Sequence, residues 1–183
     1  MIEPLKIRTP LDDEALAGLR AGDSVWLSGR VYTGRDAAHR RLFEAIGRAE
    51  SLPINLQDET MFYAAPTPAR PGRVIGSIGP TTSGRMDVFT PRLIEAGLRG
   101  MIGKGMRSQE VVEAMKKHRA VYFGAIGGVA ALTARCVREA VVAAYDDLGP
   151  EAILRLAVVD LPLVVVNDIH GGDLYRDVMR RKS

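Results

Sequence analysis

Residues 73–117 read RVIGSIGPTTSGRMDVFTPRLIEAGLRGMIGKGMRSQEVVEAMKK, and this stretch decides the fold. Twice in it an apolar segment leads into a glycine-containing loop, and the loop leads into a helix that begins after a hydroxyl residue. We expect a strand at 73–78, a loop at 79–87, a helix at 91–96 capped by Thr90, a strand at 98–102, a loop at 103–107 and a helix at 109–117 capped by Ser108. Strands that alternate with helices in this way are typical of an α/β domain.

The flanking sequence continues this alternation with less regular spacing. Before residue 73 the pattern predicts a helix that starts at Thr9 and Pro10 and ends at Gly22, a strand at 24–33 broken near Gly29, a helix at 35–48, and a proline-rich connection at 51–72 holding a short strand at 61–65. After residue 117 it predicts a strand at 120–125, a turn at Gly127 and Gly128, a helix at 129–136, apolar runs at 140–144, 155–159 and 163–166, and a charged helix or tail at 173–182. Because strands cluster near both ends without full helices between them, a plain doubly wound sheet is not expected.

Composition argues against several classes of protein. The chain has 183 residues, 46% of them hydrophobic, which suits one domain spanning 1–183. A net charge of +3 and an aromatic content of 5% argue against nucleic-acid binding. No run approaches the ~20 apolar residues of a membrane span, and the N-terminus lacks a long apolar segment. We therefore expect a cytoplasmic protein that binds no membrane.

The chain holds one cysteine, Cys136, in a stretch rich in alanine, valine and leucine. A thiol in such surroundings is typically buried and unreactive. One cysteine cannot form a disulfide framework, and the sequence lacks the ligand spacings of a zinc or iron–sulfur site. We expect no metal site within this chain.

Three glycine-containing loops each follow an apolar strand and place a cation near the start of the next element. The cations are Arg35 after Gly34, Arg85 after Gly84, and Lys104 after Gly103. Loops at the carboxyl ends of strands collect free N–H groups and are where ligands bind in open α/β sheets. Arginine forks match carboxylates and lysine supplies a point charge, so the three cations together suit a doubly charged acid. Taken singly, each is more typical of a solvated surface charge.

The loop at 79–87, GPTTSGRMD, is the most informative of the three. Its glycines have the spacing of a phosphate-binding P-loop, but Arg85 and Met86 stand where that motif needs lysine followed by serine or threonine. The P-loop interpretation therefore fails. Thr81, Thr82 and Ser83 offer hydroxyl donors and acceptors to a ligand, although a plain turn has a similar composition.

His39 lies four residues after Arg35, so both project from one face of the predicted helix. An imidazole beside a bound anion could move a proton near neutral pH, or it could orient a neighbour. A helix-surface histidine without a role is equally compatible with the pattern.

These segments resemble the beta region of the class I fumarase and L-tartrate dehydratase group of iron–sulfur hydro-lyases. The resemblance rests on four segments in family order: GRDAAH at 34–39, GPTTSGRMD at 79–87, IGKG at 102–105 and GGVAAL at 127–132. Weaker similarity continues at 160–162 and 168–171. GPTTSGRMD is the most specific of them, and the segments span nearly the whole chain.

The resemblance implies reversible hydration of a dicarboxylate, with fumarate to malate as the leading case. In that family an iron of a 4Fe-4S cluster acts as Lewis acid on the substrate. By position, Arg35, Arg85, Lys104 and Thr82 are then substrate contacts, and Thr81 matches the hydroxyl proposed to move the proton, with His39 as a nearby candidate. The implied fold is of the swivelling β/β/α type, like the fumarase C-terminal domain.

The resemblance also implies a partner. In the family three cysteine thiolates of the alpha region bind the 4Fe-4S cluster, and this chain lacks that region. We therefore expect a beta subunit that works with a cluster-bearing alpha subunit, with further oligomerisation. Two alternatives stay open at this point: the beta subunit of an L-tartrate dehydratase, and a non-catalytic module that binds dicarboxylates.

Overall fold

The computed structural model describes residues 3–125 and 130–180 as a mixed α/β structure. Its strands form one seven-stranded sheet in the order β1-β2-β3-β4-β5-β7-β6, and β2 pairs with β7 as well. The strands are β1 (Leu5–Thr9), β2 (Ser24–Thr33), β3 (Thr60–Phe62), β4 (Gly100–Gly103), β5 (Val121–Ala125), β6 (Val137–Ala144) and β7 (Ile153–Asn167).

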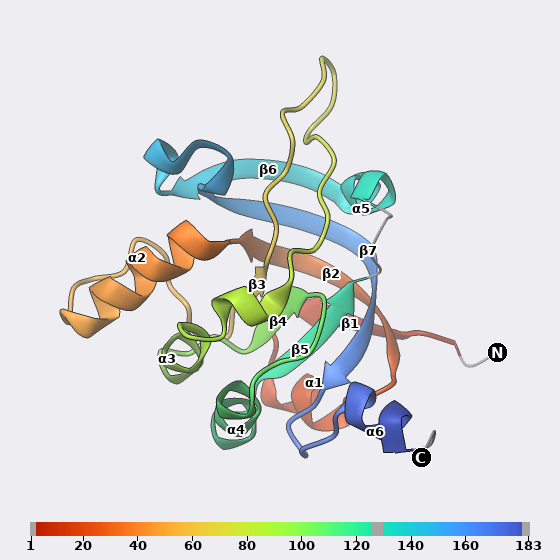
Figure 1. Cartoon of the computed structure of the whole chain (residues 1–183). Helices are drawn as coiled ribbons and strands as arrows, with labels where there is room; N and C mark the ends of the chain where they lie inside the picture. Colours follow the sequence, from red (N-terminus) through yellow and green to blue (C-terminus); the bar gives the residue numbers. More distant parts are fainter. Residues whose placement is uncertain (1–2, 126–129, 181–183) are drawn as a thin grey trace.

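The helices lie mainly around the parallel part of the sheet (Figure 1). The α-helices are α1 (Asp13–Gly18), α2 (Asp36–Gly47), α3 (Thr90–Glu95), α4 (Gln109–His118), α5 (Ala130–Cys136) and α6 (Leu174–Arg180). Two short 3-10 helices, η1 (Ser83–Met86) and η2 (Asp146–Glu151), complete the set. None of the described helices is both long and apolar enough to cross a membrane.

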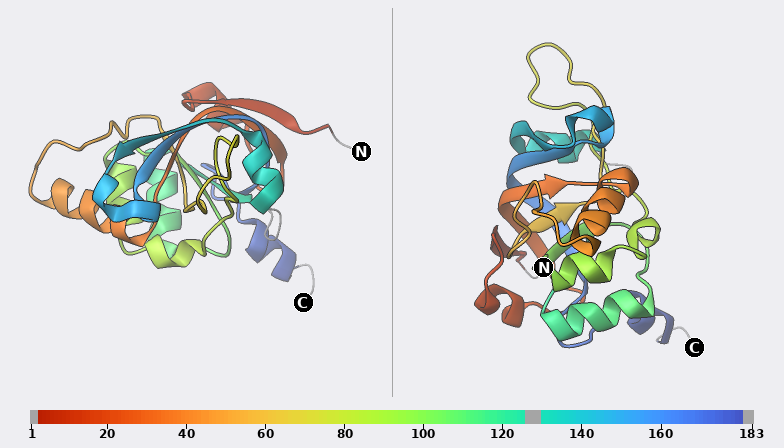
Figure 2. Two further views of the ribbon diagram at one scale, coloured as in Figure 1. Left: turned by 90° about the horizontal axis from the view of Figure 1, so that it is seen from above. Right: turned by 90° about the vertical axis from the view of Figure 1, so that its left-hand side faces the viewer.

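The sheet closes on itself. β2, β3, β4 and β5 are neighbours and run parallel, and α2, α3 and α4 lie in the connections between them. The long strand β7 runs antiparallel to both β5 and β2, so it joins the two ends of the parallel group. The view from above in Figure 2 shows the resulting curvature. β1 pairs in parallel with the first half of β2, and β6 pairs in antiparallel fashion with the first half of β7.

Alternation of side chains along the strands builds two cores. Phe62, Ile102 and Phe123 point into the ring and pack with apolar residues of β2 and β7. The neighbouring residues, such as Met61 and Met101, point outward and pack with α2, α3 and α4. Because successive side chains of a strand face opposite sides, each parallel strand contributes to both cores. This double burial explains the uninterrupted apolar character of the short central strands.

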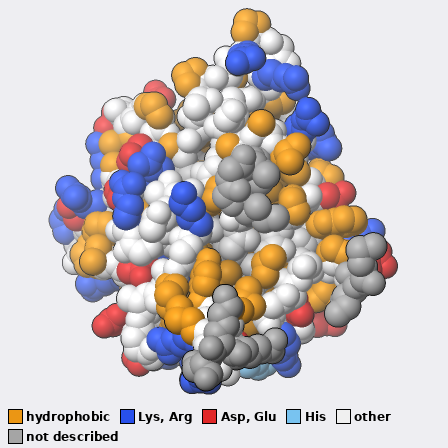
Figure 3. All heavy atoms as spheres, turned by 45° about the vertical axis from the view of Figure 1, so that its right-hand side comes forward, with side chains coloured by type: hydrophobic (Ala, Val, Ile, Leu, Met, Phe, Trp, Pro, Cys, Tyr) orange, Lys and Arg blue, Asp and Glu red, His pale blue; other side chains and the backbone are white. Residues whose placement is uncertain are grey.

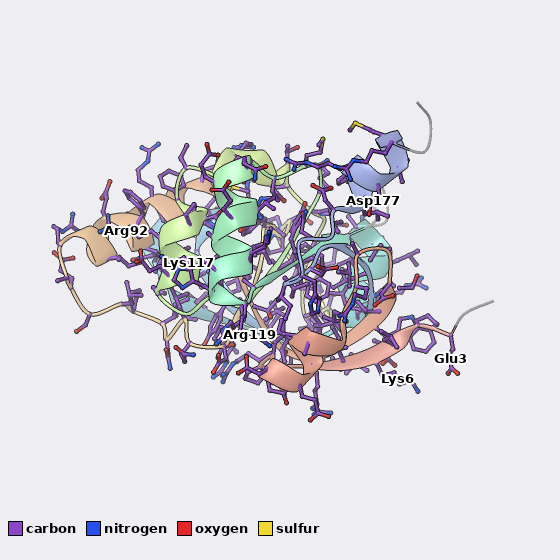
Figure 4. All side chains as sticks on the ribbon, turned by 90° about the horizontal axis from the view of Figure 1, so that it is seen from below. Glu3, Lys6, Arg92, Lys117, Arg119 and Asp177 are labelled. Atoms are coloured by element: carbon purple, nitrogen blue, oxygen red, sulfur yellow. The ribbon has the colours of Figure 1, made fainter. Side chains whose placement is uncertain are left out.

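The α2, α3 and α4 helices pack side by side over the outer core. Helix α4 begins as predicted, because the Ser108 hydroxyl accepts a hydrogen bond from the Val111 N–H. Its far end reaches α1, where the Arg119 guanidinium lies 3.2 Å from the Asp13 carboxylate. Figure 4 shows this end of α4 from below, with Lys117 and Arg119 labelled.

The prediction of a strand at 73–78 is wrong. These residues belong to an extended arm between β3 and η1, which projects from the body of the molecule in Figure 1. Its two sides are joined where the Thr67 N–H donates to the Ser77 carbonyl at 2.9 Å. The opposing side carries Pro66, Pro68 and Pro71, and prolines lack the N–H that a strand ladder needs.

Three local predictions about helix ends are also wrong. Thr9 does not cap a helix, because it ends β1, a strand the pattern missed; Asp12 caps α1 instead. Helix α1 ends at Gly18 rather than at Gly22. Thr90 is the first residue of α3, and its hydroxyl donates to the Met86 carbonyl at 2.9 Å rather than capping the helix.

The C-terminal half largely follows the prediction. The three apolar runs lie in β6 and β7, and the charged tail forms α6. The turn at Gly127 and Gly128, and the first residue of the helix predicted at 129–136, lie outside the described residues. On the face shown in Figure 3, exposed apolar side chains form separate groups with lysine and arginine between them.

Candidate functional site

The three glycine-and-cation loops leave the same edge of the sheet, because β2, β3 and β4 are parallel neighbours. The Gly34 N–H donates to the Phe62 carbonyl at 3.0 Å, which ties the exit of β2 to β3. The Thr81 N–H donates to the Tyr63 carbonyl at 2.7 Å, which brings the end of the arm back beside β3. The chain therefore returns from the arm to the edge where β2 ends.

The second and third loops pair with each other. Thr82 and Lys104 form a parallel β-bridge. The Ser83 N–H donates to the Lys104 carbonyl at 2.9 Å, and the Lys104 N–H donates to the Thr81 carbonyl at 3.3 Å. Backbone bonds thus place Thr81 and Thr82 beside Lys104.

Arg35 and Arg85 meet around the carboxylate of Asp36. Arg85 donates from Nε to Asp36 Oδ1 at 2.9 Å and from Nη2 to Oδ2 at 2.7 Å. Arg35 Nε lies 3.8 Å from the same Oδ2, and its Nη2 lies 3.5 Å from the Glu151 carboxylate. The structure thus brings together the two arginines that the sequence singled out.

Arg35 has an unused donor. Its side chain is 26% exposed, yet its Nε atom is buried and makes no hydrogen bond with any described residue. A buried donor without a partner costs free energy, which is recovered when an acceptor reaches it. Arg35 is also the N-cap residue of α2, with an extended backbone, so the start of this helix fixes its position.

Lys104 and Thr82 are exposed, and Thr81 is half-buried. Within residues 3–125 and 130–180, Lys104 forms no ion pair, so its charge is available. Ser83 differs from the two threonines: it is fully buried, and its hydroxyl lies 2.9 Å from the Tyr122 hydroxyl. The prediction that three consecutive hydroxyls face a ligand therefore holds for at most two.

His39 is fully buried against the first turn of α2. Its Nδ1 lies 2.9 Å from the Arg35 carbonyl, which requires Nδ1–H to donate and leaves Nε2 as an acceptor. Burial lowers the pKa of His39 to about 4, despite the opposing effect of the Arg35 carbonyl, so the imidazole is neutral near pH 7. Of the two roles considered for His39, this geometry favours orienting Arg35 over moving protons at neutral pH.

Arg107 was not predicted as a site residue, and its guanidinium is fully buried beneath the site. Arg107 Nε donates to Asp87 at 2.7 Å, and its other nitrogens reach the hydroxyls of Tyr63 and Thr90. The Tyr122 hydroxyl donates to the Gly105 carbonyl at 3.0 Å. This buried network ties the loop that carries Arg85 to the loop that carries Lys104. A buried arginine has no periodic signature, and the only sequence signal was the aspartate that ends GPTTSGRMD.

Two glycines of the site lie in close approach to side chains of neighbouring segments. A Cβ on Gly103 would lie 1.9 Å from the Ser83 hydroxyl oxygen. A Cβ on Gly34 would lie 2.8 Å from the Met61 sulfur. Gly103 therefore lets its loop approach the loop that carries Ser83, and Gly34 leaves room for the Met61 side chain of β3.

With this geometry in place, comparisons with known proteins identify the family. A family profile described as "Fumarase C-terminus" matches residues 2–178. The chain belongs to the fumarase C-terminus family. This confirms the group that the motifs indicated.

Relatives of this fumarase C-terminus chain fall into two size classes. The aerobic class I fumarate hydratase of Salmonella typhimurium is 40% identical over 154 residues, covering 83% of this chain and 27% of that relative. Fumarate hydratase 2 of Leishmania major is 35% identical over 173 residues, 92% of this chain and 30% of that relative. A proposed L(+)-tartrate dehydratase subunit beta of Methanocaldococcus jannaschii is 36% identical over 169 residues, 89% of this chain and 87% of that relative. The chain spans less than a third of these fumarate hydratases.

The side chains of this fumarase C-terminus chain do not fit an iron–sulfur cluster. In the described part of the chain, no three His, Cys, Asp or Glu side chains gather as a metal site. The single thiol, Cys136, is half-buried on α5 and makes weak hydrogen bonds to the Leu132 and Asp160 carbonyls. Burial raises the pKa of this thiol, which disfavours the thiolate that an iron ligand needs.

Proposed function

We propose that this chain is the beta subunit of a two-chain iron–sulfur fumarate hydratase, which hydrates fumarate reversibly to malate. The observation that carries the proposal is the meeting of Arg35 and Arg85 at the edge of the sheet where Lys104 also emerges. Two arginines and a lysine match the two carboxylates of fumarate and the negative charge that develops during hydration. The buried, unpartnered Nε of Arg35 is an unused donor for such a ligand.

In this proposal each side chain has a stated task. Arg35 and Arg85 bind the substrate carboxylates, Lys104 stabilises developing negative charge, and Thr82 adds a hydroxyl contact. Thr81 is the proposed proton carrier because it matches the hydroxyl assigned that role by the family resemblance, and its backbone is bonded to Tyr63 and Lys104. The His39 Nδ1–H donates a hydrogen bond to the Arg35 carbonyl and so helps to orient Arg35. The arginines are pre-oriented by the fold, which lowers the entropic cost of binding.

The 4Fe-4S cluster is proposed to belong to a partner alpha subunit, because this chain has one cysteine. Its chemistry would be that of a Lewis acid acting on the substrate. The two-chain arrangement is supported by the relative from Methanocaldococcus jannaschii, which is named as a beta subunit and is of nearly the same length. The swivelling β/β/α fold is supported by the closed ring of strands with helices outside it. Further oligomerisation and a cytoplasmic location stay predictions.

The relative from Methanocaldococcus jannaschii also supports tartrate as a second candidate substrate. It is named for L(+)-tartrate, which also carries two carboxylates, so the cation set accommodates either acid. Tartrate dehydratase activity would use the same arginines and the same partner. A substrate panel separates the two, because the hydroxyl groups of tartrate need contacts that fumarate does not.

Affinity purification of the tagged chain from its own cells, followed by iron analysis and fumarate hydration assays, tests the proposal. The expected result is co-purification of a second, iron-containing subunit and hydration activity in the complex. The chain expressed alone should contain no iron and should be inactive until the partner is added. Turnover by the chain alone in metal-free buffer would contradict the two-chain arrangement. Dicarboxylate binding without any cluster-bearing partner would identify a non-catalytic module instead.

A further inference from the structure

One carboxylate of this chain lies among the cations that the proposed function assigns to the substrate. Asp36 accepts two hydrogen bonds from Arg85 and lies 3.8 Å from Arg35 Nε. Such a carboxylate could act in either of two ways. Asp36 could occupy the Arg85 guanidinium and so compete with the ligand. Alternatively, it could hold one side of that guanidinium and leave its other N–H donors free for the ligand.

The contact uses one side of the Arg85 guanidinium. Nε and Nη2 each donate to a different Asp36 oxygen. A guanidinium has five N–H donors, so three remain, two on Nη1 and one on Nη2. Among the described residues, Nη1 of Arg85 has no hydrogen-bond partner, and the side chain is 51% exposed. The free edge presents the paired geometry that a second carboxylate can accept.

Asp36 is itself fixed. It is the first residue of α2 and its side chain is 30% exposed. The neighbouring carboxylate, Glu151, accepts from the Ala37 N–H at 3.2 Å and lies 3.5 Å from Arg35 Nη2. Each Asp36 oxygen accepts a hydrogen bond from Arg85, and Arg35 contributes only the longer contact of 3.8 Å to Oδ2.

We propose that Asp36 is a positioning residue, which holds the Nε–Nη2 side of Arg85 so that the Nη1–Nη2 edge faces a carboxylate of the ligand. This inference rests on the proposed function, because it assumes that Arg85 binds a dicarboxylate. Without Asp36, Arg85 is an exposed, flexible side chain on the short helix η1. Fixing such a side chain at the moment of binding costs roughly two- to tenfold in affinity.

The test is an NMR titration of the ¹⁵N-labelled full chain with fumarate. The variants are Asp36→Asn, Arg85→Ala and the double variant. Asp147→Asn is the matched control, because Asp147 also receives two bonds from one arginine, Arg41, but is not among the site residues. The dissociation constant is read from the amide shifts of residues 81–85 and 103–105. The Nε–H resonance of Arg85 is followed separately.

The expected result is that Asp36→Asn weakens fumarate binding by about two- to tenfold and broadens the Arg85 Nε–H resonance, while Asp147→Asn changes neither. In the Arg85→Ala background, Asp36→Asn should leave affinity unchanged or tighten it, because only the repulsion between Asp36 and the ligand is then removed. Tighter binding by Asp36→Asn alone would overturn the inference and make Asp36 a competitor. Equal weakening in both backgrounds would also overturn it, since Asp36 would then act through something other than Arg85.

The inference and the proposed function fail in different ways. If Arg85→Ala leaves fumarate affinity unchanged, Arg85 is not a ligand contact and the proposed function loses its main support. If Arg85→Ala weakens binding but Asp36→Asn does not, the proposed function stands and only the positioning role of Asp36 is overturned.

Discussion

The guanidinium of Arg107 and the carboxylate of Asp87 form an ion pair at 2.7 Å beneath the candidate site, where the arginine side chain is fully buried and the aspartate side chain is 10% exposed. The second Asp87 oxygen accepts from the Ser108 N–H at 2.6 Å, at the start of α4. This pair joins the end of the GPTTSGRMD loop to the loop after β4.

Removing one partner of this pair should destabilise the protein strongly. We expect Asp87→Ala to lower the free energy of unfolding by about 3 to 5 kcal/mol, because it leaves a buried guanidinium without its counter-ion. Urea denaturation followed by circular dichroism measures this. Asp147→Ala, at an exposed ion pair, should lower the free energy of unfolding far less, because solvent screens that pair. A similarly small effect for Asp87→Ala would show that the buried pair does not hold the loops together.

Truncating either arginine of the site should impair activity of the complex. Arg35→Ala and Arg85→Ala each remove a charge-assisted contact of about 1.5 to 3 kcal/mol, so kcat/KM for fumarate should fall roughly 10- to 100-fold. Arg85→Lys should also reduce activity, because an ammonium cannot reproduce the fork. Arg48→Ala is the control, since Arg48 pairs with Glu50 at the other end of α2. Unchanged activity in both site variants would place the site elsewhere.

Burial of neutral His39 should make stability depend on pH in a defined window. Its pKa of about 4 lies below the usual 6.5, so between these values the unfolded chain binds more protons than the folded one. Stability due to His39 is therefore full above pH 6.5 and declines as the pH falls toward 4. Between pH 6.5 and 5 the wild type should lose about 1.5 kcal/mol more than His39→Gln. Equal pH dependence of the two unfolding free energies would contradict a buried, neutral imidazole.

Filling the space at Gly103 should disturb the contact between two loops. Gly103→Ala brings a Cβ within 1.9 Å of the Ser83 hydroxyl oxygen, and such overpacking typically costs about 1 to 3 kcal/mol of unfolding free energy. Adding Ser83→Ala should recover part of this loss. Gly47→Ala, where the new Cβ meets no neighbour, should not destabilise the protein. Thermal denaturation of the three variants and the wild type checks the series, and a Gly103→Ala protein as stable as the wild type would refute the close approach.

Much of the parallel part of the fold is readable from the sequence, because its signals are local. Ser108 before α4 and glycines after short apolar strands fix where those elements begin and end. Local signals also led to the wrong predictions described above, and two of them show why. The valine and isoleucines at 73–78 predicted a strand. The opposite side of the arm carries prolines, which have no backbone N–H to donate to a neighbouring strand. Thr9 read as a helix cap, although Asp12 occupies that position in the structure.

The candidate site likewise contains some residues that the sequence predicts and others that it does not. Arg35, Arg85 and Lys104 carry a sequence signal, since each follows a glycine at a predicted strand exit. The burial of Arg107 and of the Ser83 side chain depends on how loops distant in sequence pack together, so no local sequence pattern predicts it. The burial of His39 also comes from tertiary packing. The ring centroids of His39 and Tyr63 lie 4.9 Å apart, and the two ring planes are nearly perpendicular.

A crystal structure of the complex with bound fumarate tests the central claim most directly. The account predicts one carboxylate of the ligand within hydrogen-bonding distance of Arg85 and the other near Arg35, with the Lys104 ammonium beside the same molecule. Fumarate bound at a site that none of these three side chains reaches would contradict it.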